Sequence, residues 1–172
     1  MGYFPRTTEP YQRRVSERDW HNYGPSAFRK LAFSLLDMAL LTGVTLRLGR
    51  AALLAYSGDS NSEMFLTSLL AGTFFLFLMA TLHLGNFPVR HWVWRAPVFG
   101  LAVGAVEAGV SLLLISVGRE PFGSGQAAFG DWLTMALTIV PWRLTLVVTF
   151  AIALAFVVRG VRLVTLGSEE RL

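Results

Sequence analysis

Two oppositely charged residues stand inside the most apolar parts of this sequence. Glu107 lies ten residues before Val117, where its segment ends, and Arg143 lies ten residues after Leu133, where the next segment begins. If both segments are helical, each residue is ~15 Å from the same membrane face. A lone carboxylate at that depth in a bilayer costs several kcal/mol unless it is protonated, paired or hydrated. The matching depths predict an ion pair between neighbouring helices, with Arg47 as a further candidate partner.

This intramembrane pair has two main interpretations. As a structural clamp, it would fix how two helices pack. As a proton or anion site, it would need a second acidic residue or a histidine at the same depth, and the sequence offers none there. We therefore favour the clamp, with contact to another subunit or a ligand as a third possibility.

A second polar pair is predicted near the opposite membrane face. Asp37 lies ~10 Å, and His83 ~5 Å, from the end of its segment at that face. These depths favour a hydrogen-bonded Asp–His pair. No nucleophile, metal-ligand set or oxyanion donor accompanies them, so no catalytic residue and no metal is assigned. No cofactor is expected either, although His83, the one histidine well inside an apolar segment, leaves a single-histidine chlorophyll-type pigment as an alternative.

Other residues are typical of packing and anchoring. Gly100, Gly104 and Ala108 form a small-residue stripe with four-residue spacing, which predicts a close helix contact. Four tryptophans are predicted to lie at the membrane interfaces and to anchor the bundle among lipid headgroups: Trp92, Trp94, Trp132 and Trp142.

The composition requires lipid as solvent around these residues. Of 172 residues, 53% are hydrophobic and only 15% are charged, too few to cover a soluble globule. The absence of cysteine excludes disulfides, thiolate metal sites and cysteine nucleophiles. Because the basic residues gather at the ends of apolar segments, they indicate membrane topology and not nucleic-acid binding.

The hydrophobic segments predict an all-α fold, an integral membrane four-helix antiparallel bundle. Residues 1–27, rich in aromatic, basic and proline residues, form an arm expected to lie on headgroups or a partner, and residues 28–172 form the transmembrane domain. The first span either ends near residue 50 or continues to Tyr56, and Pro141 predicts a kink or a break in the last. The expected spans are 28–50, 64–85, 96–117 and 132–158.

The distribution of basic residues predicts the orientation. Arg119 alone lies in the loops on one side, so the other side, with both termini, is expected to face the cytoplasm of a bacterial inner membrane. The basic residues on that side are Arg6, Arg13, Arg14, Arg18, Arg29, Lys30, Arg90, Arg95, Arg159, Arg162 and Arg171.

Function is argued by elimination, since the sequence has no paired catalytic carboxylates, phosphate loop or nucleophile triad. The favoured interpretation is a non-catalytic subunit or an assembly and stabilising factor of a larger membrane complex, with energy-transducing (respiratory or photosynthetic) complexes as candidates. Its partners would be other membrane protein subunits and lipids. The alternatives are a small oligomeric channel or transporter using Glu107 and Arg143, and then a membrane enzyme.

The orientation is tested by cysteine accessibility. Ser60→Cys and Ser124→Cys lie in the two loops predicted to be opposite the termini, so in intact cells both should react with an impermeant thiol reagent added outside. Labelling of both only after the cytoplasm is opened would reverse the predicted orientation.

Overall fold

The computed structural model describes residues 32, 34–56, 62–122 and 125–169 of the chain. The predicted arm, the start of the first span and the turn after Tyr56 therefore lie outside the described residues. The elements in chain order are α3 (Leu35–Tyr56), α4 (Ser62–Leu84), η2 (Val89–His91), α5 (Trp92–Ser116), β1 (Pro121–Phe122), β2 (Gly125–Gln126), η3 (Phe129–Asp131) and α6 (Trp132–Glu169).

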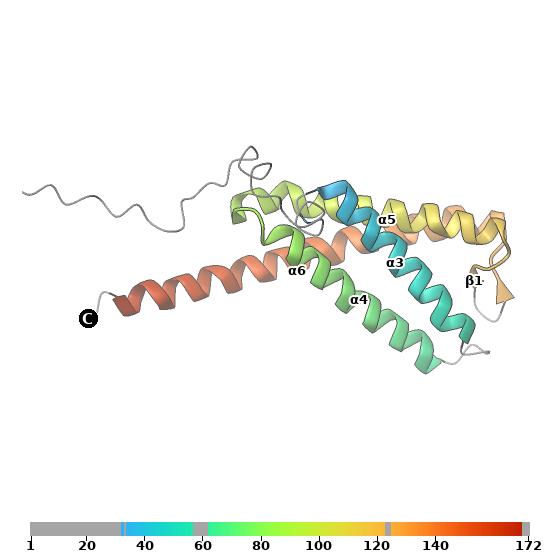
Figure 1. Ribbon diagram of the computed structural model, residues 1–172, viewed down its shortest axis with the longest axis horizontal. Helices are drawn as coiled ribbons and strands as arrows, with labels where there is room; N and C mark the ends of the chain where they lie inside the picture. The colour runs from blue at the N-terminus through green and yellow to red at the C-terminus, as the bar shows by residue number, and fades with distance from the viewer. Residues whose placement is uncertain (1–31, 33, 57–61, 123–124, 170–172) are drawn as a thin grey trace, which may run out of the picture.

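Four of these elements, α3, α4, α5 and α6, are long and apolar enough to cross a membrane. The predicted all-α four-helix bundle is confirmed, and the chain is a membrane protein. In Figure 1 consecutive helices run in opposite directions along the bundle. The helix α5 packs against both α3 and α6, whereas α4 packs chiefly against α3.

The helix ends differ from two of the expectations. The helix α3 continues to Tyr56, beyond the expected end of the first span at residue 50. The helix α6 is continuous through Pro141 and runs on past residue 158 to Glu169, so the alternative of two separate helices is wrong. Its 38 residues measure ~57 Å, well beyond a hydrocarbon core of ~30 Å, and its C-terminal part extends past the other helices (Figure 1).

Glycine residues on α5 and α3 allow the helices to approach closely. A Cβ on Gly104 would lie 2.8 Å from the Cα of Val140, and one on Gly100 would lie 3.0 Å from the Cα of Leu144. Both contacts are with the backbone of α6, so the small-residue stripe forms the α5–α6 interface. On the other side of α5, a Cβ on Gly43 of α3 would lie 2.9 Å from a backbone oxygen of α5.

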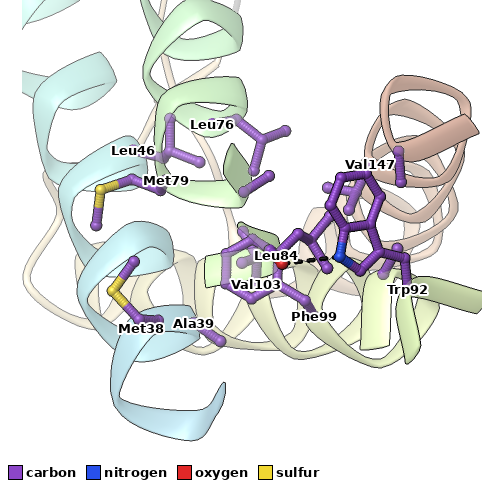
Figure 2. Packing of buried hydrophobic residues seen from close by; sticks show 13 residues of the cluster. Met38, Ala39, Leu46, Leu76, Met79, Leu84, Trp92, Phe99, Val103 and Val147 are labelled. Atoms are coloured by element: carbon purple, nitrogen blue, oxygen red, sulfur yellow. Dashed lines mark hydrogen bonds between the residues drawn. The ribbon is translucent and has the colours of Figure 1, made fainter. Parts of the chain in front are cut away.

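A hydrophobic core fills the part of the bundle near the α4–α5 connection (Figure 2). Phe99 and Leu76 are fully buried within it, and the rings of Phe77 on α4 and Phe150 on α6 stack with centroids 4.3 Å apart. This stacking joins α4 to α6.

The tryptophans do not all lie where lipid anchors would. Trp92 is buried, and its indole Nε1 donates to the carbonyl oxygens of Leu84 at 2.7 Å and Phe87 at 3.0 Å. It therefore caps the end of α4 instead of contacting headgroups. Trp94 and Trp142 are exposed, but Trp142 lies well inside the continuous α6, away from either helix end.

The remaining tryptophan, Trp132, begins α6 and joins it to α5. Its Nε1 donates to the carbonyl oxygen of Ala108 at 2.8 Å, although that carbonyl already belongs to the backbone of a helix. Ala108, which is buried, is the last member of the small-residue stripe. A methyl side chain at this position leaves room for the indole of Trp132 to reach the backbone.

The close α5–α6 approach predicts the effect of one added methyl group. Gly104→Ala should lower the free energy of unfolding by about 1–3 kcal/mol, because the new Cβ meets backbone that cannot rotate away. Gly109→Ala is the matched control, since no atom lies within 4 Å of its added Cβ. Thermal unfolding in mild detergent measures both, and equal midpoints for the two variants would contradict the close packing.

Candidate functional site: two buried ion pairs

The structure brings Glu107 and Arg143 together as the sequence predicted. Arg143 donates from Nε to Glu107 Oε1 at 2.5 Å and from Nη2 to Oε2 at 3.0 Å, so the guanidinium holds both carboxylate oxygens. Only 2% of the Glu107 side chain and 9% of the Arg143 side chain is exposed. Such a two-point contact is among the strongest hydrogen-bonded ion pairs, and it fixes the relative orientation of the two groups.

A second buried ion pair joins Arg47 to Glu120. Arg47 donates from Nε to Glu120 Oε2 at 3.3 Å, from Nη2 to Oε1, and from Nη2 to Ser111 Oγ at 3.2 Å. Both charged side chains are almost fully buried, with 3% and 1% exposed. Arg47 is therefore enclosed by the protein, and no hydrogen bond described joins it to Glu107.

The sequence analysis missed Glu120 because it stands in a loop. After α5, Gly118 adopts a positive φ of 65° and Arg119 N–H donates to the Leu114 carbonyl at 2.8 Å, which ends the helix and turns the chain back. The backbone of Glu120 is then held by the Ala127 N–H at 2.9 Å. The short β1–β2 hairpin follows directly, so the turn folds a loop carboxylate against α3.

One signal in the sequence pointed to this contact. Arg47 is a charged residue within an apolar helix and needs a partner. With Glu107 assigned to Arg143, the candidates at the corresponding end of the next helices are Asp59, Glu63, Glu120 and Asp131, and the sequence does not choose among them.

The two pairs meet on one face of α5. Glu107 and Ser111 are one helical turn apart, and they receive Arg143 from α6 and Arg47 from α3. Two cations and two anions make this buried group neutral. A buried ion pair adds little net stability over an apolar replacement, because desolvation offsets the attraction, but it penalises any packing that separates the charges. The arrangement therefore specifies how α3, α5 and α6 pack.

Arg50, one turn beyond Arg47 on α3, is only half buried. Its guanidinium carbon lies 5.1 Å from the centroid of the Phe65 ring on α4, which is a cation–π distance. Arg50 thus links the α3–α4 hairpin.

The predicted Asp37–His83 pair is wrong. Asp37 is exposed, and its backbone N–H donates to the Ser34 hydroxyl oxygen at 3.3 Å, whereas His83 is fully buried with Nδ1 3.0 Å from the carbonyl oxygen of Ala32. The two residues lie at similar depths, but depth does not give the direction in which a helix face points. The carbonyl oxygen of Ala32 pairs with Nδ1 of the imidazole instead.

A pigment at His83 stays a prediction. Because a carbonyl can only accept, Nδ1 is the protonated nitrogen and Nε2 carries the lone pair, which is the state in which histidine binds a metal. Nε2 is nevertheless buried without a hydrogen-bond partner, and the ring stacks on Phe99 with centroids 5.4 Å apart. A ligand on Nε2 would have to displace core side chains.

These features define a four-helix membrane protein with two buried ion pairs. No family model matches the sequence, and neither a curated protein nor a solved structure shows significant similarity to the chain.

The ion pairs predict a double-mutant cycle. Glu107→Gln or Arg143→Met alone should cost ~3–5 kcal/mol, because each leaves a buried charge without its counter-charge, while the double variant should be less destabilised than the sum. The comparison uses thermal unfolding in detergent. The same cycle at Arg47→Met and Glu120→Gln tests the second pair, and strict additivity in either cycle would reject the coupling.

Proposed function

We propose that this chain is a non-catalytic integral membrane subunit, or an assembly and stabilising factor, of a larger membrane protein complex. Energy-transducing complexes, respiratory or photosynthetic, are the candidates. The proposal covers the partners as well: other membrane protein subunits beside the bundle and lipids around it.

The observation that carries this proposal is the closure of both buried ion pairs. A channel or transporter that used Glu107 and Arg143 would have to expose them to water or substrate, yet each is buried and its charge is bound to the other. Arg47 and Glu120 are equally enclosed. The four buried charges of these two pairs therefore act on each other, as expected of a scaffold.

The separation of Asp37 from His83 weakens the enzyme alternative. A proton-transferring pair requires the two groups to be within hydrogen-bond reach or joined by a water. Here Asp37 is exposed and His83 faces the core. The pair that would have provided acid–base chemistry is thus not assembled.

The lateral surface of the bundle leaves room for partners. Exposed apolar side chains recur every four residues along α4, at Leu66, Leu70, Phe74 and Leu78, and form a ridge on one helix face. Lipid can cover such a ridge, and so can the helix of another subunit. The arm of residues 1–27 adds aromatic and basic side chains suited to a partner's surface.

The decisive experiment is purification of the tagged full-length chain in a gentle detergent or in nanodiscs, followed by identification of the co-purifying proteins. We expect a reproducible set of membrane proteins in fixed ratio. Deleting residues 2–20 should remove these partners without changing the unfolding midpoint of the bundle.

Two results would contradict the proposal. If the chain purifies by itself and conducts ions or a solute in liposomes, with the flux abolished by Glu107→Gln, it is a transporter. If deletion of residues 2–20 abolishes membrane insertion or folding, the arm belongs to the fold and does not serve partners.

A further inference from the structure

The last part of α6 extends beyond the helix against which it packs. Gly100 of α5 lies against the backbone of Leu144 in the antiparallel α6. Trp92, where α5 begins, is eight residues before Gly100. The residue of α6 at the same level is therefore the eighth after Leu144, which is Ile152. The rest of α6, up to Glu169, has no part of α5 beside it (Figure 1).

Exposed side chains form a stripe along this extension. Ile152, Phe156 and Leu163 are all exposed, the last two by 69% and 75% of their surface. Arg159, three residues after Phe156 and four before Leu163, is exposed as well. Spacings of three and four residues place these side chains on one face of a helix. We call Ile152, Phe156, Arg159 and Leu163 the α6 stripe.

Lipid tails do not reach the far end of the α6 stripe. The 25 residues of α5 measure ~37 Å, which already exceeds a hydrocarbon core of ~30 Å. Leu163 lies eleven residues, or ~16 Å, beyond the level of Trp92. The headgroup layer adds only ~5–8 Å on each side of the core. A large apolar side chain that projects past this layer is typical of a protein-binding surface.

The charge of the extension restricts what kind of protein can cover it. No acidic residue occurs between Asp131 and Glu169 in the sequence, and the two ion pairs found among the described residues do not include Arg159. A second copy of this chain, paired through the same face, would bring two Arg159 guanidinium groups together, which is unfavourable. The better partner offers apolar side chains to Phe156 and Leu163 and a carboxylate to Arg159.

We propose that the α6 stripe binds an acidic amphipathic helix of another subunit, on the side of the membrane where the α4–α5 connection lies. A helix that binds a partner does so through anchors at intervals of three, four and seven residues, and the stripe has this spacing. A carboxylate beside Arg159 would fix the register of the two helices. The inference rests on the proposed role in a complex and names the surface through which the chain would serve it.

A designed peptide tests the chemistry of this surface. The full-length chain is placed in phosphatidylcholine nanodiscs, and the probe is a fluorescent amphipathic peptide with leucine on one helix face and glutamate beside it. We expect saturable binding that empty nanodiscs lack. Arg159→Glu and Leu163→Ala should each weaken this binding about fivefold. Leu137→Ala is the matched control, because Leu137 is 66% exposed on the same helix but lies within the bundle.

A reversal of charge distinguishes direct contact from damage to the fold. The same peptide with lysine in place of glutamate should bind the Arg159→Glu variant better than it binds the original chain. The unfolding midpoint of each variant in detergent should match that of the original chain, since Arg159 and Leu163 are exposed. Failure of the lysine peptide to recover binding would contradict a contact between Arg159 and a carboxylate.

Purification of the tagged full-length variants relates this surface to the proposed complex. If a set of partners co-purifies, Leu163→Ala and Arg159→Glu should reduce the recovery of one member, and Leu137→Ala should not. A partner set that neither variant changes would overturn the inference and leave the proposed function intact. A chain that purifies by itself yet binds the acidic peptide would contradict the proposed function and support the surface.

Three results would assign the α6 stripe to a different occupant or to none. Equal binding of the acidic and basic peptides would show unspecific apolar contact. A homodimer that Leu163→Ala dissociates would identify a second copy as the occupant. A fluorophore attached at Leu163→Cys that shifts to the blue when phosphatidylglycerol is added to the nanodiscs would place the extension on the membrane surface.

Discussion

The cost of charge in a low-dielectric interior is the constraint on which this bundle depends. Arg47, Glu107, Glu120 and Arg143 are all nearly excluded from solvent, and each is stabilised by an opposite charge brought by a different part of the chain. Because an unpaired buried charge is far more costly than the pair is favourable, the contacts act mainly against wrong packing. Sliding α6 along α5 by one turn would separate Glu107 from Arg143 and expose neither to water.

Close helix contact makes these short ion pairs possible. The glycines of α5 let its backbone approach that of α6, and Gly43 of α3 provides the corresponding contact on the other side. In a bilayer, where lipid tails are as apolar as leucine, helix association relies on such packing and on polar contacts between helices. Small residues and charges are thus complementary parts of one three-helix unit centred on α5, with α4 added through α3, the Phe77–Phe150 stacking and the Arg50–Phe65 contact.

The two ends of the bundle are built differently. At one end, the loop after α5 turns back through Gly118 and inserts Glu120 against Arg47. At the other, Trp92 closes the α4–α5 connection by bonding backbone carbonyls, and Arg90 lies exposed at the surface. A loop that supplies a buried counter-charge is part of the core, whereas a connection that presents arginine and exposed tryptophan is suited to the headgroup layer.

The sequence by itself determined the properties that depend on composition and on distance along a helix. Long apolar segments require a bilayer, which gives the all-α fold and its four spans. The rise per residue of a helix gives the depth of each residue in the membrane, and this depth was sufficient to match Glu107 with Arg143. Four-residue spacing was sufficient to assign Gly100, Gly104 and Ala108 to a close contact, although not to identify α6 as the neighbour.

Only the tertiary structure decided the contacts that depend on rotation about a helix axis or on the path of a loop. Depth placed Asp37 near His83, but the rotation of α3 leaves Asp37 exposed while the backbone at Ala32 reaches the imidazole. Trp92 lies at a helix end, as expected of a lipid anchor, yet its ring turns inward to carbonyls. Glu120 is adjacent to a span in sequence, and the local turn at Gly118 brings it back toward the bundle. It becomes the counter-charge of Arg47 only through a contact between distant parts of the chain, which residue spacing does not encode.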